Sequence, residues 1–220
     1  RLLVWGLFQV EPGFLPLWRR YARALKQRNA LLKAGGGGHQ LDAWDHELAE
    51  AGESLTGYRE RYLAELAPQA MRIAGELTPH LTLTALEFQP GWRRQELSLG
   101  DALLLGRERD RISGHTGSGP HRADWSIQLA GLPGREALSR GQTKLTALAM
   151  LLAQASDYAA RRGQWPVIAL DDLPSELDRE HQSRVLDFLL ERPGLQLFAT
   201  ATEIPAVLGQ LTREAHVFHV

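Results

Sequence analysis

The sequence contains no cysteine, which excludes disulfide frameworks and thiolate metal sites and fits a protein of the reducing cytoplasm. It also contains no apolar run near the roughly 20 residues that a helix needs to cross a bilayer. Its first residues lack the ordered charged, apolar and cleavage segments of a signal peptide. We therefore expect a cytoplasmic protein without a membrane partner.

An excess of charge of either sign is missing as well. The 25 Lys and Arg residues are balanced by 26 Asp and Glu residues, for a formal net charge of −1. Nucleic-acid phosphates are bound by clustered cations, so any DNA contact must depend on local patches. What is present is a hydrophobic content of 44% in 220 residues, enough for a sizeable core. The chain starts with Arg1 inside an apolar run, which leads us to expect a fragment.

The first third of the chain predicts a pair of long helices. Apolar residues 2–10 are expected to form a strand, and a helix is expected over residues 11–33. Four glycines at 35–38 end that helix, and a second helical segment spans about residues 41–77, with Pro68 expected to kink it. Because a short turn joins them, the two helices should pack as an antiparallel hairpin.

Strands and helices alternate in the remainder of the chain. The expected strands cover residues 81–88, 125–129, 167–170 and 195–200, and the expected helices cover about 100–109, 139–162 and 179–191. Ser98 is placed to cap the first of these helices. Continuous apolar strands that alternate with helices indicate an α/β sheet covered on both faces.

Two carboxylates follow the apolar strand at residues 167–170. Asp171 and Asp172 would lie at the C-terminal end of a buried strand, where open α/β sheets bind their ligands. Phosphoryl transfer needs one carboxylate for Mg²⁺ and a second to orient and polarise the attacking water. The alternative is that Asp172 caps the next turn and Asp171 only ends the strand.

The long helix begins with the segment Ser139-Arg140-Gly141-Gln142. A Ser-x-x-Gln pattern is typical of a capping box, which satisfies unpaired backbone amides and needs no ligand. The same helix start, with free N–H groups, a hydroxyl and a glycine, can also meet a nucleotide γ-phosphate closely. Both interpretations can hold together.

Three segments in order resemble the nucleotide motifs of ABC-type ATPases. Residues 138–144 resemble the ABC signature, residues 167–172 resemble a Walker B strand, and residues 175–178 resemble the D-loop. An Asp as the second acidic residue, together with Gly-Pro-His-Arg-Ala-Asp at 119–124, is more similar to the RecF family than to a transporter domain. Residues 5–12 and 27–33 also resemble that family, so the resemblance covers nearly the whole chain.

The resemblance implies an α/β fold: a portion of an ABC-type ATPase head with an inserted antiparallel helical arm. Residues 1–13 would end the N-terminal lobe of the head, residues 14–80 would form the arm, and residues 81–220 would form the C-terminal lobe.

RecF-like proteins bind ATP with Mg²⁺, dimerise head to tail around the nucleotide, and work with other recombination mediator proteins at gapped or junction DNA. The resemblance implies that the signature residues act on the γ-phosphate held by the opposite subunit. These residues are Ser139, Arg140, Gly141 and Gln142. Asp171 would then hold Mg²⁺ and Asp172 would be catalytic for the subunit's own nucleotide, while Ser175 and Asp178 of the D-loop would face the dimer contact.

Two expected parts of such a site are missing. No Gly-x-x-x-x-Gly-Lys-Ser/Thr occurs, and the glycine-rich loop at 114–119 continues with Pro120, so we interpret it as a turn. We therefore expect the chain alone neither to bind ATP tightly nor to hydrolyse it. A histidine after the last strand is also absent, and Thr200 or Thr202 is the candidate γ-phosphate sensor in its place.

The first helix is basic, with Arg19, Arg23 and Lys26 on one face. DNA-backbone contact is one explanation, and a solvated face is the commoner one. Trp5, Trp18 and Trp125 fall at apolar positions of their elements and are expected in the core and not as ligand-stacking residues.

Three alternatives to a RecF-like repair ATPase remain open from the sequence. A transporter nucleotide-binding subunit predicts Glu after Asp171, which the sequence does not have. A chromosome or repair ATPase with long coiled coils predicts a far longer arm than residues 14–77. A scaffold with relic ATP motifs is the non-enzymatic alternative.

Overall fold

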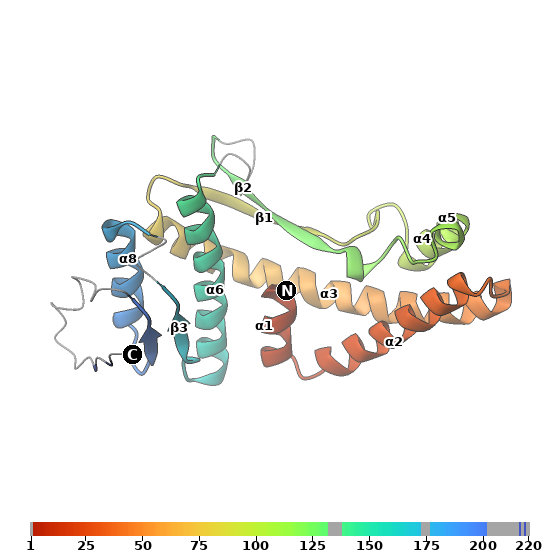
Figure 1. The fold of residues 1–220 in the computed structure, drawn as a ribbon, viewed down its shortest axis with the longest axis horizontal. Coiled ribbons are helices and arrows are strands. Elements are labelled where there is room, and N and C mark those ends of the chain that lie inside the picture. The colour runs from red at the N-terminus through yellow and green to blue at the C-terminus, as the bar shows by residue number, and fades with distance from the viewer. Residues whose placement is uncertain (1, 132–137, 173–176, 202–215, 217, 219–220) are drawn as a thin grey trace. The chain divides into compact units, whose positions relative to one another are not determined.

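The computed structural model describes residues 2–131, 138–172, 177–201, 216 and 218 (Figure 1). The chain divides into two compact units. Unit 1 comprises residues 1–67 and 85–127, and unit 2 comprises residues 68–84 and 128–220. The candidate ATPase motifs all fall in unit 2, and the candidate DNA-binding helix falls in unit 1.

Unit 1 is built mainly from helices. They are α1 (Leu2–Val10), α2 (Phe14–Lys33), the first part of α3 (Gly38–Leu77), α4 (Leu99–Leu105), α5 (Arg107–Ser113) and a short 3₁₀ turn (Pro120–Arg122). α2 and α3 form the expected hairpin, joined at Gly35, whose positive φ of 67° suits a residue without a side chain (Figure 1). Pro68 lies inside α3, so it does not end this helix.

The strand expected at residues 2–10 is wrong, because this segment is helix α1. Its buried residues are Leu3, Gly6 and Leu7, at the i, i+3, i+4 spacing of one helix face. Phe8 packs edge to face against Phe14, with ring centroids 5.3 Å apart. A short, uniformly apolar run does not distinguish a strand from a buried helix by periodicity, and here the contacts with α2 select the helix.

The expected helix at 100–109 is two helices, because Gly106 ends α4 and begins α5. Ser98 caps α4 as predicted, since its hydroxyl accepts a hydrogen bond from the Asp101 N–H at 3.1 Å. The loop at 114–119 contains no helix or strand, as predicted.

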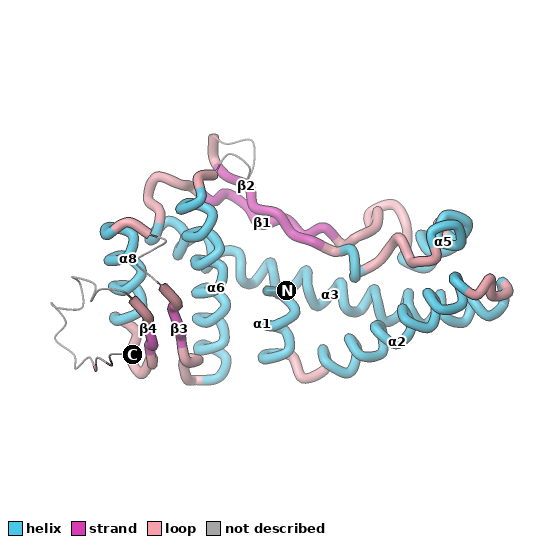
Figure 2. Tube along the Cα trace, viewed as in Figure 1, coloured by secondary structure: helices cyan, strands magenta, loops and turns pink. Residues whose placement is uncertain are grey.

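Strand β1 (Leu83–Gln89) pairs with β2 (Asp124–Leu129), and residues of both strands fall in each unit. Unit 2 otherwise contains α6 (Arg140–Arg162), β3 (Ile168–Leu170), α8 (Arg179–Leu190) and β4 (Leu197–Ala199). β3 and β4 are parallel, with Ile168 opposite Leu197 and Leu170 opposite Ala199 (Figure 2). Both strands therefore end at the same edge.

The predicted burial of these strands is wrong. Val167 before β3 is 59% exposed, and Phe198 in β4 is 63% exposed. In the part of the chain that the structure describes, β3 and β4 pair only with each other, so no further strand or layer covers these side chains. The buried apolar residues of unit 2 lie instead on α6, such as Leu145 and Ala149, and on α8, such as Val185 and Leu186.

The core of unit 1 contains one fully buried cation, Arg28 of α2. Its Nη1 donates to Asp110 Oδ2 at 2.7 Å and to Thr116 Oγ1 at 2.9 Å, and its Nε donates to Asp45 Oδ1. These partners lie on α3, on α5 and in the following loop. Arg28 therefore joins the α5 region to the hairpin through Nε and Nη1, whereas its buried Nη2 has no hydrogen-bond partner among the described residues.

Replacing Arg28 with Ala should destabilise unit 1 by about 3–5 kcal/mol, because Asp45 and Asp110 would lose a buried countercharge. The measurement is urea unfolding followed by tryptophan fluorescence, which reports mainly on unit 1 because Trp165 alone of the six tryptophans lies outside it. The control is Arg23→Ala on the same helix, at an exposed site, with a change below about 0.5 kcal/mol. An Arg28 variant as stable as this control would contradict the assignment.

Candidate functional site

Three polar residues meet at the common edge of β3 and β4. Asp171 and Asp172 follow β3, and Thr200 follows β4. The Thr200 hydroxyl donates to Asp171 Oδ1 at 2.7 Å and accepts from the Asp172 N–H at 2.9 Å. The Thr200 N–H in turn donates to the Leu170 carbonyl at 3.0 Å. Thr200 therefore links the two strand ends and orients the carboxylate of Asp171.

Asp172 has a left-handed backbone with a φ of 51°, the only positive φ of a non-glycine residue in the described chain. This conformation costs roughly 1–3 kcal/mol and persists where neighbouring contacts over-determine it. The hydrogen bond to Thr200 is one such contact. Asp171 and Asp172 are both exposed at the strand end.

The donor set at this edge suits Mg²⁺, which is usually held by one or two carboxylates together with water and substrate phosphates. Asp171 and Asp172 supply such carboxylates. Within residues 2–131, 138–172 and 177–201, no group of three or more His, Cys, Asp or Glu side chains could hold a metal ion. The edge is therefore an open two-carboxylate arrangement.

The start of α6 is a complete capping box. The Ser139 hydroxyl accepts from the Gln142 N–H at 3.2 Å, and the Ser139 N–H donates to Gln142 Oε1 at 2.9 Å. The capping interpretation is thereby confirmed. The N–H groups of Arg140 and Gly141 have no hydrogen-bond partner among the described residues, as expected in the first turn of a helix.

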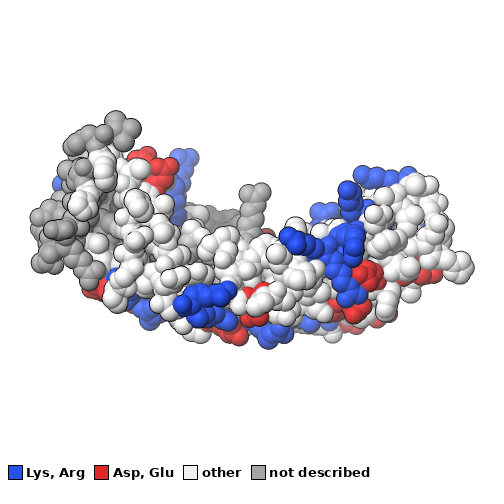
Figure 3. Space-filling model, turned by 90° about the horizontal axis from the view of Figure 1, so that it is seen from below, with Lys and Arg blue, Asp and Glu red and all other residues white. Residues whose placement is uncertain are grey.

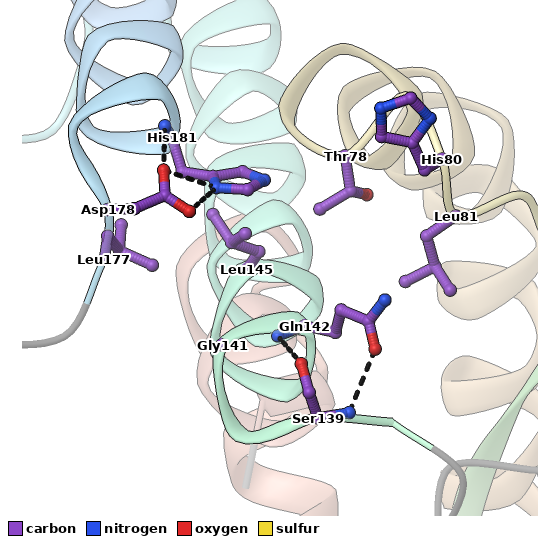
Figure 4. Close-up of a pocket in the computed structure, with 10 residues that line it drawn as sticks. All are labelled: Thr78, His80, Leu81, Ser139, Gly141, Gln142, Leu145, Leu177, Asp178 and His181. Carbon is purple, nitrogen blue, oxygen red and sulfur yellow. Dashed lines mark hydrogen bonds and ion pairs between the residues drawn. The ribbon is translucent and has the colours of Figure 1, made fainter.

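A pocket of about 260 Å³ opens beside this helix start (Figure 4). It is lined by residues of α6, of the α8 start and of the turn between α3 and β1. They are Ser139, Gly141, Gln142, Leu145, Leu177, Asp178, His181, Thr78, His80 and Leu81. The pocket thus brings three of the four expected signature residues, Ser139, Gly141 and Gln142, together with Asp178 of the expected D-loop, and Arg140 does not line it. Ser175 and Thr202 lie outside the described residues.

Asp178 caps α8 through its carboxylate. Its Oδ1 accepts from the His181 N–H at 2.9 Å, and His181 Nδ1 lies 2.8 Å from both carboxylate oxygens. The backbone N–H of His181, and then its ring, hold the pKa of Asp178 below its usual range because both stabilise the ionised form. His181 was missed by the sequence analysis, although a histidine three residues after a capping Asp could have indicated this contact.

The expected basic face of α2 is present. Arg19, Arg23 and Lys26 are exposed and have no ion-pair partner in the described chain. Arg20 instead forms a two-bond contact with Glu47 of α3, at 2.6 and 2.8 Å. Seen from below, Lys and Arg side chains gather over α2 with acidic side chains beside them (Figure 3).

Two tryptophans expected in the core are partly exposed. Trp5 is 47% exposed and Trp18 is 38% exposed. Trp18 packs against Phe8 with ring centroids 5.8 Å apart, so it contacts α1 without being covered. Its helical position is apolar, but the described chain has no further layer over that face.

The segment at 119–124 has a structural role in unit 1. The Tyr21 hydroxyl lies 2.7 Å from His121 Nδ1, and Arg59 donates to the Pro120 carbonyl at 2.6 Å. A Cβ atom on Gly119, where φ is 132°, would lie 2.8 Å from the Tyr21 hydroxyl. Glycine is therefore needed at this position for close packing on α2.

No helix among the described residues is both long enough and apolar enough to span a bilayer. This observation agrees with the absence of long apolar runs in the sequence.

The chain is similar to proteins of one name along its whole length, although no protein-family model matches it. It is 66% identical over 220 residues to the DNA replication and repair protein RecF of Stenotrophomonas maltophilia (strain R551-3), covering all of this chain and 60% of that relative. It is 43% identical over 209 residues to RecF of Pseudomonas paraeruginosa (strain DSM 24068 / PA7), covering 92% of this chain and 54% of that relative. The chain therefore spans about 60% of the length of the first of these curated relatives.

A solved structure, described as the recombination mediator protein RecF with ATP in the RecFOR pathway, matches with a TM-score of 0.77 at 26% identity. The match covers 91% of this chain and 56% of that one. A second structure of the same protein matches with a TM-score of 0.76. These matches confirm the expected fold class, a portion of an ABC-type ATPase head.

The Asp178 contacts predict a pH-dependent stability. Because its folded pKa is lowered, the contribution of the ionised carboxylate is present above the unfolded value near 3.9 and is lost as pH falls through the folded value. Asp178→Ala should therefore have a lower melting temperature than the unsubstituted chain at pH 7, and this difference should shrink as pH falls below about 4. Asp178→Asn, which retains a capping oxygen, should lose less at pH 7. A deficit of Asp178→Ala that persists unchanged at pH 3 would contradict the assignment.

Proposed function

Because this chain belongs to the RecF family, we propose that it forms the part of a recombination repair ATPase that completes the nucleotide site of an opposite subunit. The observation that carries this proposal is the pocket in which Ser139 and Gly141 of the α6 start lie with Asp178 of the α8 start. The 66% identity to RecF favours this function over those of a transporter subunit or a scaffold.

The start of α6 is suited to a phosphate group. Two backbone N–H groups, at Arg140 and Gly141, have no hydrogen-bond partner among the described residues and lie at the positive end of a 23-residue helix. The Ser139 hydroxyl, already oriented by the capping box, adds a further polar contact. We propose that this helix start binds the γ-phosphate of ATP held by the opposite head.

Gly141 supports the same proposal by a different route. A Cβ atom at this position would meet no atom within 4 Å, and its φ is not positive. Glycine loses more conformational entropy than alanine when it is fixed in helical geometry, so it is not the residue that helix stability favours. Since nothing in the described chain requires glycine here, the close approach of a ligand from outside the chain is the explanation that we favour.

The carboxylates at the β3 edge would serve the nucleotide of their own subunit. Mg²⁺ bound there would neutralise the charge of the β- and γ-phosphates. Asp171, oriented by Thr200, is the residue that would hold it. Asp172, which is exposed, would orient the attacking water and accept its proton.

Thr200 has a more specific role than the sensor predicted from the sequence. Its hydroxyl is engaged by Asp171 and by the backbone of Asp172, at 2.7 and 2.9 Å. We propose that Thr200 positions Asp171 and Asp172. To donate to a γ-phosphate, its hydroxyl would have to give up the hydrogen bond to Asp171. Thr202 remains a candidate sensor from the sequence alone.

DNA is the proposed macromolecular partner, at gaps or junctions and together with other mediator proteins. A related solved structure is described as that of the recombination mediator protein RecF in the RecFOR pathway. On this chain the exposed cations of α2, Arg19, Arg23 and Lys26, have the spacing of one helix face and are available for phosphate contacts. A cytoplasmic location follows from such a partner.

The chain should associate with full-length RecF of S. maltophilia only in the presence of ATP and Mg²⁺, because its helix start would complete the other protein's nucleotide site. Gly141→Ala should weaken this association about tenfold or more, since the added methyl group would meet the phosphate. The measurement is surface-immobilised full-length RecF titrated with the chain, in ATP and in ADP.

The matched control is Gly75→Ala, another helical glycine of unit 2 whose Cβ would meet nothing within 4 Å. Both substitutions should leave thermal stability equal or slightly raised. Calorimetric titration of the chain alone with ATP-Mg should show no saturable binding at micromolar concentrations, because no phosphate-binding loop occurs in the sequence. If Gly141→Ala and Gly75→Ala associate with full-length RecF equally tightly, the role assigned to the start of α6 is contradicted.

Replacing Arg19, Arg23 and Lys26 together with Ala should weaken binding of the chain to a fluorescent gapped duplex. The slope of log affinity against log salt should fall by roughly one unit per phosphate contact removed. The control removes three exposed arginines that are already paired with acidic neighbours, Arg72, Arg93 and Arg111. If the two triple variants show the same salt slope, the basic face of α2 is only a solvated surface.

A further inference from the structure

A groove of about 380 Å³ lies along the helical hairpin of unit 1. It is lined by Arg23 of α2 and by Ala43, Trp44 and Glu47 of α3. The groove therefore combines an aromatic ring with a cation and an acid. The function proposed above uses the cation and gives the ring no role.

Trp44 lies at the border of the hairpin core. Leu41 and Leu48, three residues before it and four residues after it, are fully buried, whereas the adjacent Ala43 is exposed. Trp44 is itself partly exposed. Among the described residues its indole has no aromatic or cation–π partner, and its Nε1 makes no hydrogen bond. Part of a flat apolar ring is therefore open to the groove.

The acidic side chains near Trp44 are bound by arginines. The Glu47 carboxylate accepts from Arg20 Nε at 2.6 Å and from Arg20 Nη2 at 2.8 Å. These bonds hold the pKa of Glu47 below its usual range. Each acidic residue of α3 within six positions of Trp44 has such a partner, namely Arg107 for Asp42 and Asp45, and Arg20 for Glu47 and Glu50. The negative charge beside the groove is therefore largely neutralised.

Arg23 has no partner of this kind. It is exposed, lines the groove with Trp44, and makes no hydrogen bond or ion pair with the described residues. Arg19 and Lys26 lie about one turn before and after it on α2, and both are exposed as well. The groove therefore joins an open aromatic ring to a row of cations that are available to an anionic ligand.

An aromatic ring beside available cations is the combination that binds single-stranded nucleic acid. A base stacks on the ring, and the neighbouring phosphates contact the cations. In a duplex each base is already stacked on its neighbours, so only an unpaired strand can present a base to the ring. Stacking of this kind depends little on which base is bound, because every base has a flat π face.

We propose that Trp44 binds single-stranded DNA by stacking one base on its indole, while Arg23 contacts a neighbouring phosphate. This inference rests on the proposed DNA partner of α2 and specifies which strand the hairpin binds. Arg19 and Lys26 extend the phosphate contacts along α2. The hairpin thereby distinguishes a gap from intact duplex, because only the gap provides unstacked bases.

The test compares oligothymidine with an abasic strand of the same length, which has the same phosphates and no bases. Binding of each fluorescein-labelled strand to the chain is measured by anisotropy at several salt concentrations. Trp44→Leu removes the ring and keeps an apolar side chain, Trp44→Phe keeps a ring, and Arg23→Ala removes the cation. The matched control is Trp5→Leu, because Trp5 is 47% exposed in the same unit and does not line the groove. Thermal unfolding checks that each variant folds.

The unsubstituted chain and Trp5→Leu should bind oligothymidine about tenfold more tightly than the abasic strand, the gain expected from one stacked base. Trp44→Leu should bind both strands with the affinity that the unsubstituted chain has for the abasic strand. Trp44→Phe should keep most of the preference for oligothymidine. Arg23→Ala should weaken binding of both strands equally and lower the slope of log affinity against log salt by about 0.7.

A second measurement does not require Trp44→Leu to fold. A base stacked on an indole quenches its fluorescence, so saturating oligothymidine should quench the unsubstituted chain more strongly than Trp44→Phe. The abasic strand should quench neither protein.

The inference is overturned if the unsubstituted chain binds the two strands equally tightly, or if oligothymidine quenches it no more than Trp44→Phe. It is also overturned if a folded Trp44→Leu keeps the preference for oligothymidine, or if it loses affinity for intact duplex to the same extent. In either case Trp44 serves only to close the edge of the hairpin core. Failure of the proposed DNA partner has a different signature, because the unsubstituted chain would then bind neither strand nor gapped duplex.

Discussion

Backbone N–H and C=O groups at the ends of helices and strands need hydrogen-bond partners. In unit 2, side chains of the proposed nucleotide site provide several of them. Ser139 caps α6, Asp178 caps α8, and Thr200 binds the backbone that follows β3. Each of these contacts is local and needs no ligand. Their shared effect is that these polar side chains are held in fixed orientations without a ligand, which would lower the entropic cost of binding one.

Unit 1 satisfies a different constraint, the burial of charge. Arg28 has no exposed surface, and its countercharges come from α3 and α5. Arg19, Arg23 and Lys26 of α2 are instead exposed and are not part of this buried cluster. A basic helix can therefore contain both a structural arginine and candidate phosphate contacts, and sequence spacing alone does not separate them. Burial does, because Arg28 falls on the face of α2 that also buries Tyr21, Ala24 and Leu32.

The sequence predicted most helices and strands to within a few residues, because caps and glycines mark their ends. It predicted the Ser139 cap, the break before α3 and the order of the candidate motifs. The prediction failed where one sequence pattern fits two kinds of secondary structure. The apolar run at residues 2–10 fits a strand or a buried helix, and contacts with α2 determine the outcome. It also failed where burial depends on a layer that the described chain lacks, as at Val167 and Phe198.

The two interpretations of the Ser139 segment were never exclusive, and the geometry explains why. A capping box uses the serine hydroxyl and the third N–H of the helix, and it leaves the first two N–H groups open. A cap also places no requirement on the residue at its second helical position. Glycine at 141 is therefore not accounted for by capping, by backbone conformation or by packing within the described chain. Gly119 is explained by its packing against Tyr21, whereas no contact in the described chain explains Gly141. Gly141 is therefore the stronger indication of an external ligand.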